Sequence, residues 1–428
     1  MKITFVSNYI NHHQIPFCEA MAGYGDDVEF FFIQTMPMEQ KRIDMGWAVD
    51  PKEYAFVHLF YEEKEMCTEL ILNSDVVIFG WSQDIIRDLE FRRLSSGKLS
   101  FRVSERIYRE GQWKMITPRG LINKYKEHYR YRNKPVYLLC AGAYVASDFD
   151  LIRSYPGKKL KWGYFPVSGM QLECGHFLVS GDALKCGDSH AFGKEIAQES
   201  ASEGSVVGDH SGPVRICWAG RLITLKHPEF AVKLAEDLES RGYDFEISII
   251  GDGDLKDELE KSIRDKKLEE KVRMLGGKKP AEVLDYMKTA DIFLFTSNYL
   301  EGWGAVVNEA MAGGCAVVAS KEAGAVPFLI EDGVNGYGYE GGRYADFLDK
   351  VLCLFKDRDK IFEFGKKAEE TIAKLWNPQN AAAELIRFCK EYIAGGNPSP
   401  AKEGPVSVAE NIKPAGFMRC LQEKNRLE

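Results

Sequence analysis

The sequence has no long hydrophobic run and no leader-like beginning. None of its 428 residues lies in an apolar stretch approaching about 18 residues, the length at which a membrane-spanning helix is expected. The amino terminus, MKITFVSNY, is typical of a strand and lacks the apolar centre of a signal peptide. These two absences predict a soluble protein of the cytoplasm.

A cysteine framework and a strong basic charge are also missing. The ten cysteines are scattered, and several lie inside apolar runs, which is typical of reduced core thiols. Cys174 with His176 and Cys186 with His190 match no common zinc-site spacing, so we expect no metal and no other cofactor. The net charge of −8 argues against a nucleic-acid partner.

Length and pattern predict two domains, because 428 residues exceed what one hydrophobic core usually supports. In residues 1–166 and again in 213–375, short apolar strands alternate with helical stretches. This alternation predicts an α/β fold with two doubly wound parallel sheets. Residues 167–212 are rich in Gly, Ser and acids and read as a linker with an irregular insertion. Residues 395–428, which are rich in Pro, Gly and Lys, read as a flexible tail.

The most informative stretch runs from residue 291 to residue 320. Residues 291–295 (DIFLF) and 315–319 (CAVVA) read as buried strands, and Ala305 to Ala312 has helical spacing. Gly313 and Gly314 supply a left-handed stop to that helix. The loop of this βαβ unit opens at the carboxyl ends of the strands, where open α/β sheets bind ligands.

Two carboxylates, Glu301 and Glu309, frame this loop and helix. Gly302, Trp303 and Gly304 lie at the helix start, where backbone amides can approach an anion. An ionised carboxylate accepts two hydrogen bonds from a vicinal diol, so phosphate and diol recognition together suit a nucleotide sugar. The alternative is that both glutamates are ordinary solvated side chains.

A second set of candidates lies upstream on loops that follow strands. Gly220 and Arg221 follow the strand RICWA, and Lys226 comes five residues later. Gly251 and Gly253 follow the strand FEISII, but such a glycine pair is a weak phosphate-loop signal alone. The fixed charges of Arg221 and Lys226 are suited to neutralising a diphosphate leaving group without a metal.

Residues 92–134 form a basic segment with interleaved aromatic side chains, among them Tyr125 and Tyr129. Such a segment suits an anionic membrane surface, a pyrophosphate-linked lipid acceptor or single-stranded nucleic acid. No nucleic-acid-binding module is visible, so among the functional interpretations we favour contact with the inner face of the cell membrane. The alternative is a solvated helical face over residues 121–132.

Several blocks together resemble a known family. GRLITLK, IIGDGD, VRMLG, the block from ADIFLF to CAVVAS, and AGAVPFLIEDGVNGY occur in the order found in family 4 glycosyltransferases. Those are retaining enzymes of the GT-B fold, with two Rossmann-like domains facing across a cleft. The resemblance is close over about 214–340 and looser over 1–166. There, FRVSERIY, AGAYVASDFD and KWGYFP resemble a subgroup that builds bacterial surface polysaccharides.

The resemblance implies a metal-independent transfer of a hexose, with retention, from a UDP- or GDP-sugar to a saccharide or lipid-linked saccharide acceptor. It also implies that residues 376–394 form a helix that crosses back to the first domain. Glu301, Arg221 and Lys226 would do the catalytic work. The implied donor-binding residues are Gly220, Arg221, Lys226, Gly251, Gly253, Met274, Glu301, Gly302, Trp303, Gly304 and Glu309.

Three positions depart from the family pattern. His227 follows Lys226 where the family often has glycine, and Cys315 stands where it usually has proline. The glycine-rich loop usual after the first strand is absent. Its place holds His12 and His13, which we keep as acceptor-side candidates together with Asp148. A capping or packing role is the alternative for the histidines.

Two other function classes remain open at this stage. One is a different GT-B enzyme, such as a phosphorylase or a nucleotide-sugar 2-epimerase. The other is a catalytically silent partner that binds a sugar nucleotide. Presence of both glutamates with Arg221 and Lys226 argues against silence.

Overall fold

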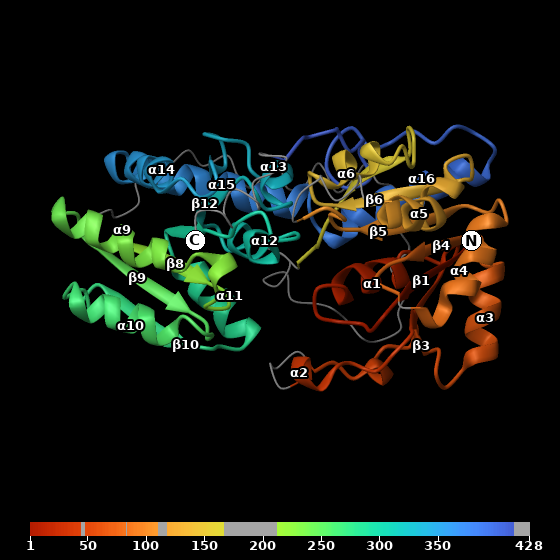
Figure 1. The fold of residues 1–428 in the computed structure, drawn as a ribbon, viewed down its shortest axis with the longest axis horizontal. Helices are drawn as coiled ribbons and strands as arrows, with labels where there is room; N and C mark the ends of the chain where they lie inside the picture. The colour runs from red at the N-terminus through yellow and green to blue at the C-terminus, as the bar shows by residue number, and fades with distance from the viewer. Residues whose placement is uncertain (44–47, 83, 110–117, 167–211, 415–428) are drawn as a thin grey trace, which may run out of the picture.

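The computed structural model describes residues 1–43, 48–82, 84–109, 118–166 and 212–414. They form two halves that lie side by side, each built on its own parallel sheet with helices on both faces (Figure 1). The predicted fold class, two doubly wound parallel sheets, is confirmed.

The first sheet has seven parallel strands in the order β3-β2-β1-β4-β5-β6-β7. Its strands are β1 (Lys2–Ser7), β2 (Glu29–Gln34), β3 (Val57–Leu59), β4 (Val76–Phe79), β5 (Ser100–Ser104), β6 (Val136–Ala141) and β7 (Lys159–Trp162). Its helices are α1 (Ile15–Ala22), α2 (Gln40–Arg42), α3 (Lys64–Asn73), α4 (Arg87–Ser95), α5 (Pro118–Glu127) and α6 (Val145–Leu151). Helix α5 ends before residue 132 and is followed by a 3-10 turn at Tyr129–Tyr131.

The second sheet has six parallel strands in the order β10-β9-β8-β11-β12-β13. Its strands are β8 (Val214–Ala219), β9 (Phe245–Ile250), β10 (Val272–Gly276), β11 (Ile292–Phe295), β12 (Ala316–Ser320) and β13 (Gly336–Tyr339). Its helices are α9 (Glu229–Ser240), α10 (Lys256–Asp265), α11 (Pro280–Thr289), α12 (Ala305–Ala312), α13 (Val326–Leu329), α14 (Tyr344–Lys356) and α15 (Asp359–Lys374).

Apolar patterning explains why these elements form. All residues of β4 and β11 are buried, because helices cover both faces of a parallel sheet. On α15 the buried side chains Ile361, Phe364, Ala368 and Ile372 recur at helical spacing and face α12 and β12. The apolar faces of the helices therefore pack on the sheets and leave the loops at the strand ends to face outward from the core.

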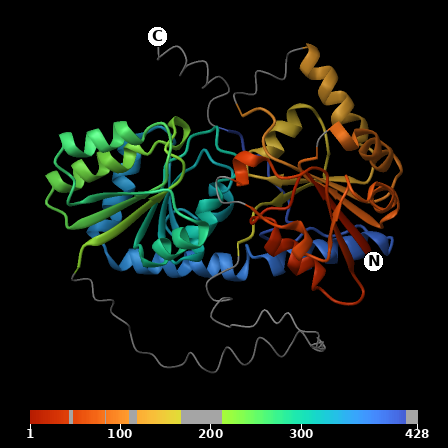
Figure 2. The same cartoon turned by 90° about the horizontal axis from the view of Figure 1, so that it is seen from below.

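The last long helix, α16 (Pro378–Ile393), packs on the first half although it follows the second half in sequence. Its residue Phe388 makes edge contacts with the rings of Phe101 and Tyr137, which lie on β5 and β6. Asn377 caps the helix by accepting a hydrogen bond from the Asn380 amide at 2.8 Å. In Figure 2 the blue helices run along both halves and join them.

The chain after α16 differs from the flexible tail that we expected. The Val406 side chain is fully buried, and residues 406–409 pair with β7. The Val406 amide donates to the Lys161 carbonyl at 2.9 Å, and the Ala409 amide donates to the Lys159 carbonyl at 3.0 Å. The physical reason is that β7 is an edge strand, whose unpaired backbone groups this segment satisfies.

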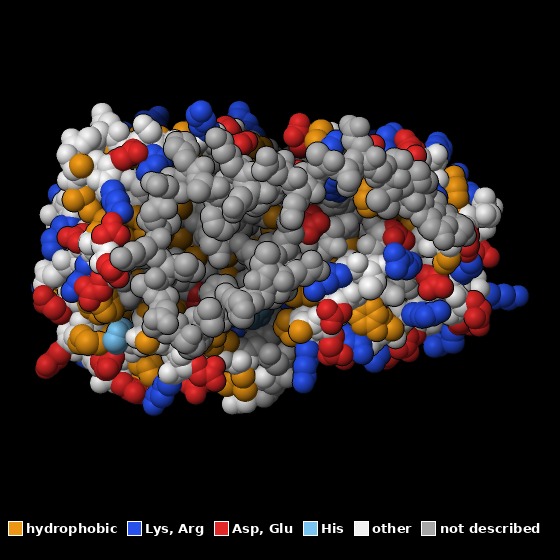
Figure 3. All heavy atoms as spheres, turned by 180° about the vertical axis from the view of Figure 1, so that it is seen from behind, with side chains coloured by type: hydrophobic (Ala, Val, Ile, Leu, Met, Phe, Trp, Pro, Cys, Tyr) orange, Lys and Arg blue, Asp and Glu red, His pale blue; other side chains and the backbone are white. Residues whose placement is uncertain are grey.

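The surface carries charges of both signs. On the back of the molecule, the described part of the surface shows Lys and Arg interspersed with Asp and Glu (Figure 3). Within the described residues, no helix combines the length and the apolar character needed to cross a bilayer.

Candidate functional site

The carboxyl ends of the strands of both sheets meet where the two halves touch. The Ala143 amide, just after β6, donates to the Gly324 carbonyl, which follows β12, at 2.9 Å. A Cβ atom on Gly324 would lie 2.8 Å from the Gly142 Cα, so only glycine fits this contact. The loops that follow the strands therefore face one another, as ligand-binding loops do in open α/β sheets.

The loop from residue 296 to residue 304 joins β11 to α12, and α12 spans the predicted residues Ala305–Ala312. Gly304 caps the helix in a left-handed conformation with φ of 93°. A Cβ there would lie 2.6 Å from the Phe295 ring. The amino end of α12 thus lies beside the junction between the halves, and in its first turn the Val307 amide donates to the Gly304 carbonyl at 3.0 Å.

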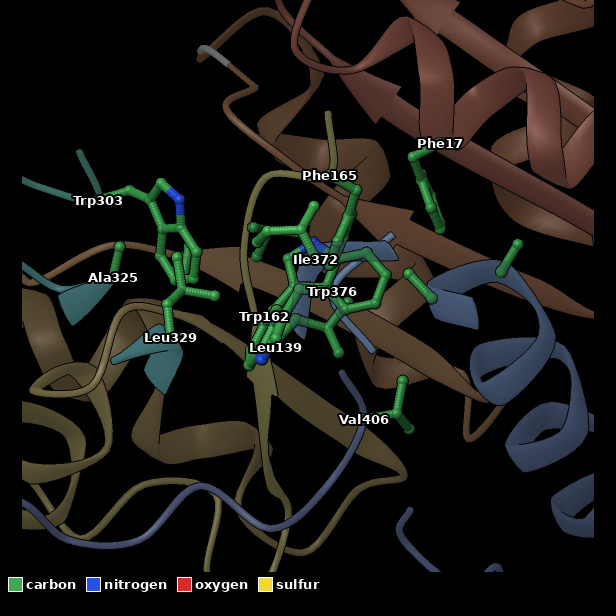
Figure 4. Close-up of a cluster of buried hydrophobic side chains, with 14 of the residues drawn as sticks. Phe17, Leu139, Trp162, Phe165, Trp303, Ala325, Leu329, Ile372, Trp376 and Val406 are labelled. Atoms are coloured by element: carbon green, nitrogen blue, oxygen red, sulfur yellow. The ribbon is translucent and has the colours of Figure 1, made fainter. Parts of the chain in front are cut away.

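The Trp303 side chain is 1% exposed and lies between the two halves (Figure 4). This burial gives Trp303 a structural role that its sequence context did not indicate. Its indole N–H donates to Asn308 Oδ1 at 2.7 Å, and Asn308 Nδ2 donates to the Tyr164 carbonyl at 3.0 Å. A Cβ on Gly163 would lie 2.3 Å from the Trp303 ring. The Trp303 ring therefore packs the loop of residues 296–304 against the residues that follow β7.

Gly302 brings a residue of the first half to the same loop. A Cβ atom at Gly302 would lie 2.6 Å from Glu105 Oε2, so the Glu105 carboxylate is packed against the glycine. Glu105 follows β5 and forms an ion pair with Arg109. Neither residue was a candidate from the sequence, because their proximity to Gly302 depends on how the halves pack.

The central pair of the site is Lys226 with Glu301. Lys226 Nζ forms an ion pair with Glu301 Oε2, and the two side chains are 15% and 17% exposed. The Lys226 backbone is also fixed, since its carbonyl accepts a hydrogen bond from Thr296 Oγ1 at 2.6 Å. Trp218 Nε1 in turn donates to Thr296 Oγ1 at 2.8 Å. The structure thus brings these two predicted residues together from separate loops.

His227 occupies a backbone conformation that favours glycine, with φ of 49° and ψ of 52°. Its Nδ1 contacts Glu229 Oε1 at 2.7 Å, and its Nε2 contacts Asn298 Nδ2 at 3.3 Å. The departure from the family's usual glycine is therefore offset by two side-chain contacts. The second contact joins the Lys226 loop to the loop that holds Glu301.

Glu309 lies on α12 and is partly buried. Burial raises the pKa of its carboxyl to about 7. No described residue makes a hydrogen bond or ion pair with this carboxylate. Hydrogen bonds donated by a ligand would stabilise the ionised form of this buried carboxylate.

Gly251 and Gly253, the candidates for a phosphate loop, are required by close packing. A Cβ on Gly251 would lie 1.8 Å from the Gly220 carbonyl oxygen, and one on Gly253 would lie 2.5 Å from the Leu222 carbonyl oxygen. They let the loops after β8 and β9 pack together at the carboxyl edge of the sheet. Met274 lies partly buried on the neighbouring strand β10.

Arg221 lies on the first of these loops, and its side chain is exposed. Among the described residues it forms no ion pair. Its guanidinium therefore keeps its hydrogen-bonding capacity for an incoming anion.

His12 and His13 lie on the loop between β1 and α1, with ring centroids 3.9 Å apart. The His13 ring lies 5.4 Å from the ring of Tyr164, which lies 6.1 Å from Trp303. Burial, with the neighbouring charges of His12 and Arg42, lowers the pKa of His13 to about 3. The histidines thus face the junction beside the loop of Glu301.

Asp148 is a correction to the acceptor-side candidates. Its side chain is fully buried, lies 3.4 Å from Arg106 Nε and accepts a hydrogen bond from the Tyr108 amide at 3.0 Å. An acceptor cannot reach a carboxylate enclosed in this way. Asp148 instead balances the charge of Arg106, whose side chain is 5% exposed.

Within the described ranges, no group of three or more His, Cys, Asp or Glu side chains is arranged to hold a metal ion. The four residues considered as zinc ligands, Cys174, His176, Cys186 and His190, lie outside those ranges.

Comparison with known proteins adds a family match in the second half. Residues 206–371 match the family described as "Glycosyl transferases group 1". The chain is 38% identical over 130 residues to the amylovoran biosynthesis glycosyltransferase AmsK of Erwinia amylovora, covering 29% of this chain and 32% of that protein. It is 32% identical over 169 residues to a poly(ribitol-phosphate) alpha-N-acetylglucosaminyltransferase of Staphylococcus aureus, covering 39% and 34%. The chain thus spans about a third of the length of these two relatives.

Solved structures match nearly the whole chain. Anabaena HepE in complex with UDP aligns with a TM-score of 0.61 at 14% identity, over 90% of this chain and 99% of that one. The fold is GT-B. The lipopolysaccharide outer core galactosyltransferase WaaB aligns with a TM-score of 0.59 at 15% identity, over 92% and 99%. In this GT-B chain the Lys226–Glu301 pair lies at the junction of the two halves.

Proposed function

We propose that the chain is a glycosyltransferase of polysaccharide biosynthesis that moves a hexose from a nucleotide diphosphate sugar to a saccharide acceptor, with retention and without a metal. The observation that carries this proposal is the mostly buried Lys226–Glu301 pair at the junction of the halves. The match of residues 206–371 to glycosyl transferases group 1 supports the same reaction class.

Lys226 and Arg221 would neutralise the diphosphate. An ammonium group has three hydrogen-bond donors, so Lys226 can keep its pair with Glu301 and still donate to phosphate oxygens. Arg221, which is exposed, can approach a diphosphate from outside. Stabilising the negative charge that develops on the leaving diphosphate is the electrostatic contribution to catalysis.

Glu301 and Glu309 would hold the hydroxyl groups of the donor. Glu301 is oriented by Lys226 and would accept hydrogen bonds from the hexose, and Glu309 would accept them from the ribose. The amides of Gly302, Trp303 and Gly304 at the start of α12 would contact the diphosphate and the sugar. The backbone near Met274 would meet the base. HepE was solved with UDP, which favours UDP in the screen of donors.

Retention would follow from attack on the same face as the leaving group. In that reaction the acceptor oxygen forms the new bond to the anomeric carbon while the bond to the diphosphate oxygen breaks. The departing diphosphate oxygen takes the acceptor's proton. Positioning of donor and acceptor between the halves then supplies much of the rate enhancement.

The acceptor would be presented at a membrane surface, on the inner face of the cell membrane. Helix α5 projects from the first half in Figure 2, and its side chains Leu121, Ile122 and Tyr125 are 48%, 56% and 57% exposed. Arg119 and Lys126 on the same helix are exposed as well. Apolar side chains beside cations suit an anionic lipid surface and, with it, a lipid-linked acceptor.

The first test is donor binding by thermal shift. UDP-, GDP- and ADP-sugars are added to the wild type and to the Glu309→Ala and Lys226→Ala variants, with and without EDTA. We expect stabilisation by one nucleotide sugar, unchanged by EDTA and lost in both variants. Glu239→Ala, a change of an exposed acid on α9, serves as the matched control and retains the shift.

The reaction itself is tested by following slow hydrolysis of the bound donor by proton NMR. The anomer that forms first reports whether configuration is retained, before mutarotation mixes the anomers. Binding without turnover on any saccharide would favour the silent partner. A changed sugar without transfer would favour an epimerase.

A further inference from the structure

An aromatic pair lies on the first half, opposite the loop that carries Glu301. Trp81 follows β4 and Tyr164 follows β7, and their rings are nearly parallel, at 7°, with centroids 6.2 Å apart. Both residues are partly exposed. The Tyr164 ring also contacts Trp303, two residues from Glu301. The pair therefore lies next to the Lys226–Glu301 site.

Two arginines place positive charge around this pair. Arg42 ends α2, and Arg109 lies beyond β5, where it is paired with Glu105. Burial raises the pKa of the Tyr164 hydroxyl to about 12; Arg109 opposes that rise, the Glu301 carboxylate adds to it, and Arg42 opposes it. Contacts place Arg109 here as well, because its partner Glu105 packs against Gly302, and the next residue, Trp303, contacts the Tyr164 ring.

The neighbouring histidines add hydrogen-bonding groups but no charge at neutral pH. Burial, together with the charge of Arg42, lowers the pKa of His12. The same influences, with His12, lower the pKa of His13 to about 3. A neutral imidazole has one donor and one acceptor, which suits a sugar hydroxyl. The surface thus combines aromatic faces, hydroxyl-binding groups and two fixed cations.

We propose that Trp81, Tyr164, His13, Arg42 and Arg109 form the acceptor subsite, and that the acceptor saccharide carries an anionic group. The apolar face of a sugar ring would pack on Trp81 and Tyr164. A carboxylate or phosphate on that sugar would bind Arg109 and Arg42, because guanidinium groups bind such anions in bidentate fashion. This inference rests on the proposed function, since it assigns the acceptor of the same reaction.

Because Arg109 is paired with Glu105, we expect it to contribute to acceptor binding only when the acceptor carries an anionic group. Glu105 holds the Arg109 side chain in place and is itself packed against Gly302. A neutral sugar would leave the guanidinium paired with Glu105 and would gain little binding free energy from it. An anionic sugar would share the guanidinium, whose five N–H groups serve more than one acceptor.

The test measures binding of sugar probes to the full chain in the presence of UDP, by saturation-transfer NMR titration. The probes are p-nitrophenyl β-D-glucuronide, glucose 6-phosphate and the neutral p-nitrophenyl β-D-glucoside. We expect at least one anionic probe to bind about 10-fold or more tightly than the glucoside. Preference for glucuronide or for the phosphate identifies which anion the subsite takes.

Variants separate charge recognition from stacking. Arg109→Ala and Arg42→Ala should each lower the affinity for the anionic probe by about 10- to 100-fold and leave the affinity for UDP unchanged. Trp81→Ala should weaken the glucuronide and the glucoside to a similar extent. Arg343→Ala, which changes an exposed arginine of the second half, is the matched control and should alter neither.

Equal binding of charged and neutral probes, or no binding of any probe while UDP binds, would overturn the anionic acceptor. Unchanged affinities in both arginine variants would overturn it as well. Failure of UDP to bind the wild type would instead contradict the proposed function, so the two failures are distinguishable.

Discussion

Lys226 and Glu301 form an ion pair in which both side chains are mostly buried, at 15% and 17% exposure. The two residues lie on loops that follow different strands, β8 and β11. The ion pair therefore forms only when these two loops are correctly positioned relative to each other. Burying both charges costs desolvation free energy, which the pair recovers only if its partners stay in place.

A double-mutant cycle tests the strength of this pair. Lys226→Ala leaves Glu301 without its cation, and we expect it to lower the free energy of unfolding by about 1–3 kcal/mol. Glu301→Gln should have a similar effect, and the double variant should lose less than the sum of the two. Urea unfolding measures all three. Strict additivity would mean that the pair contributes no coupling.

Glu309 predicts a pH dependence of stability. Its carboxyl has a folded pKa of about 7 against an ordinary value of 4.5, so the folded state holds a proton that the unfolded state releases. Stability from this group is therefore complete below about pH 4.5 and is lost as the pH rises through 7, by about 3 kcal/mol in all. Glu309→Gln should remove that loss.

The measurement for Glu309 is the free energy of unfolding of wild type and variant between pH 5 and pH 8. Glu239→Gln, on an exposed acid of α9, should follow the wild type throughout. If Glu309→Gln and the wild type kept a constant difference across this range, the raised pKa would be wrong. A nucleotide sugar whose ribose binds the ionised carboxylate should also bind more tightly at pH 8 than at pH 6.

Local sequence pattern was sufficient for the strands and helices around the site. The apolar run of β11, the spacing of α12 and the glycines after it predicted this unit with nearly the observed boundaries. The short edge strands β3 and β7 were missed, because three or four half-buried residues give little periodicity. The same weakness hid the pairing of residues 406–409 with β7.

Contacts between the halves could not be predicted from pattern alone. The contact of the Trp303 ring with Gly163 joins residues far apart in the sequence, and no local signal marks either as an interface residue. Asp148 shows the opposite failure. An acid after a strand resembles a site residue, and only the packing reveals that it neutralises Arg106.

His227 predicts an unusual order of stability among its variants. The residue has φ of 49°, a left-handed conformation that costs a non-glycine residue about 1 kcal/mol. His227→Ala keeps that strain and loses the contacts with Glu229 and Asn298, so we expect a loss of about 1–2 kcal/mol. His227→Gly relieves the strain and should unfold at a higher urea concentration than the alanine variant. The reverse order would refute this account of the position.

Asp148 is expected to matter for stability and not for substrate binding. Asp148→Ala would leave the buried Arg106 without its acid, at a cost of about 3–5 kcal/mol. Asp150→Ala changes a partly exposed acid of the same helix, paired with Lys159, and should cost less than about 1 kcal/mol. Urea unfolding compares the two. A stable Asp148→Ala protein with weakened acceptor binding would restore Asp148 as a site residue.

Helix α5 predicts binding to anionic vesicles. The triple variant Leu121→Ser, Ile122→Ser, Tyr125→Ser removes apolar side chains that are about half exposed, so it should change stability little. It should abolish cosedimentation with phosphatidylglycerol vesicles, because insertion of apolar side chains and attraction to anionic lipid act together. Phosphatidylcholine vesicles should bind neither protein. Phe362→Ser removes an equally exposed aromatic side chain on α15 and should leave binding unchanged. If the triple variant still cosedimented with anionic vesicles, α5 would be a solvated face and the lipid contact would lie elsewhere.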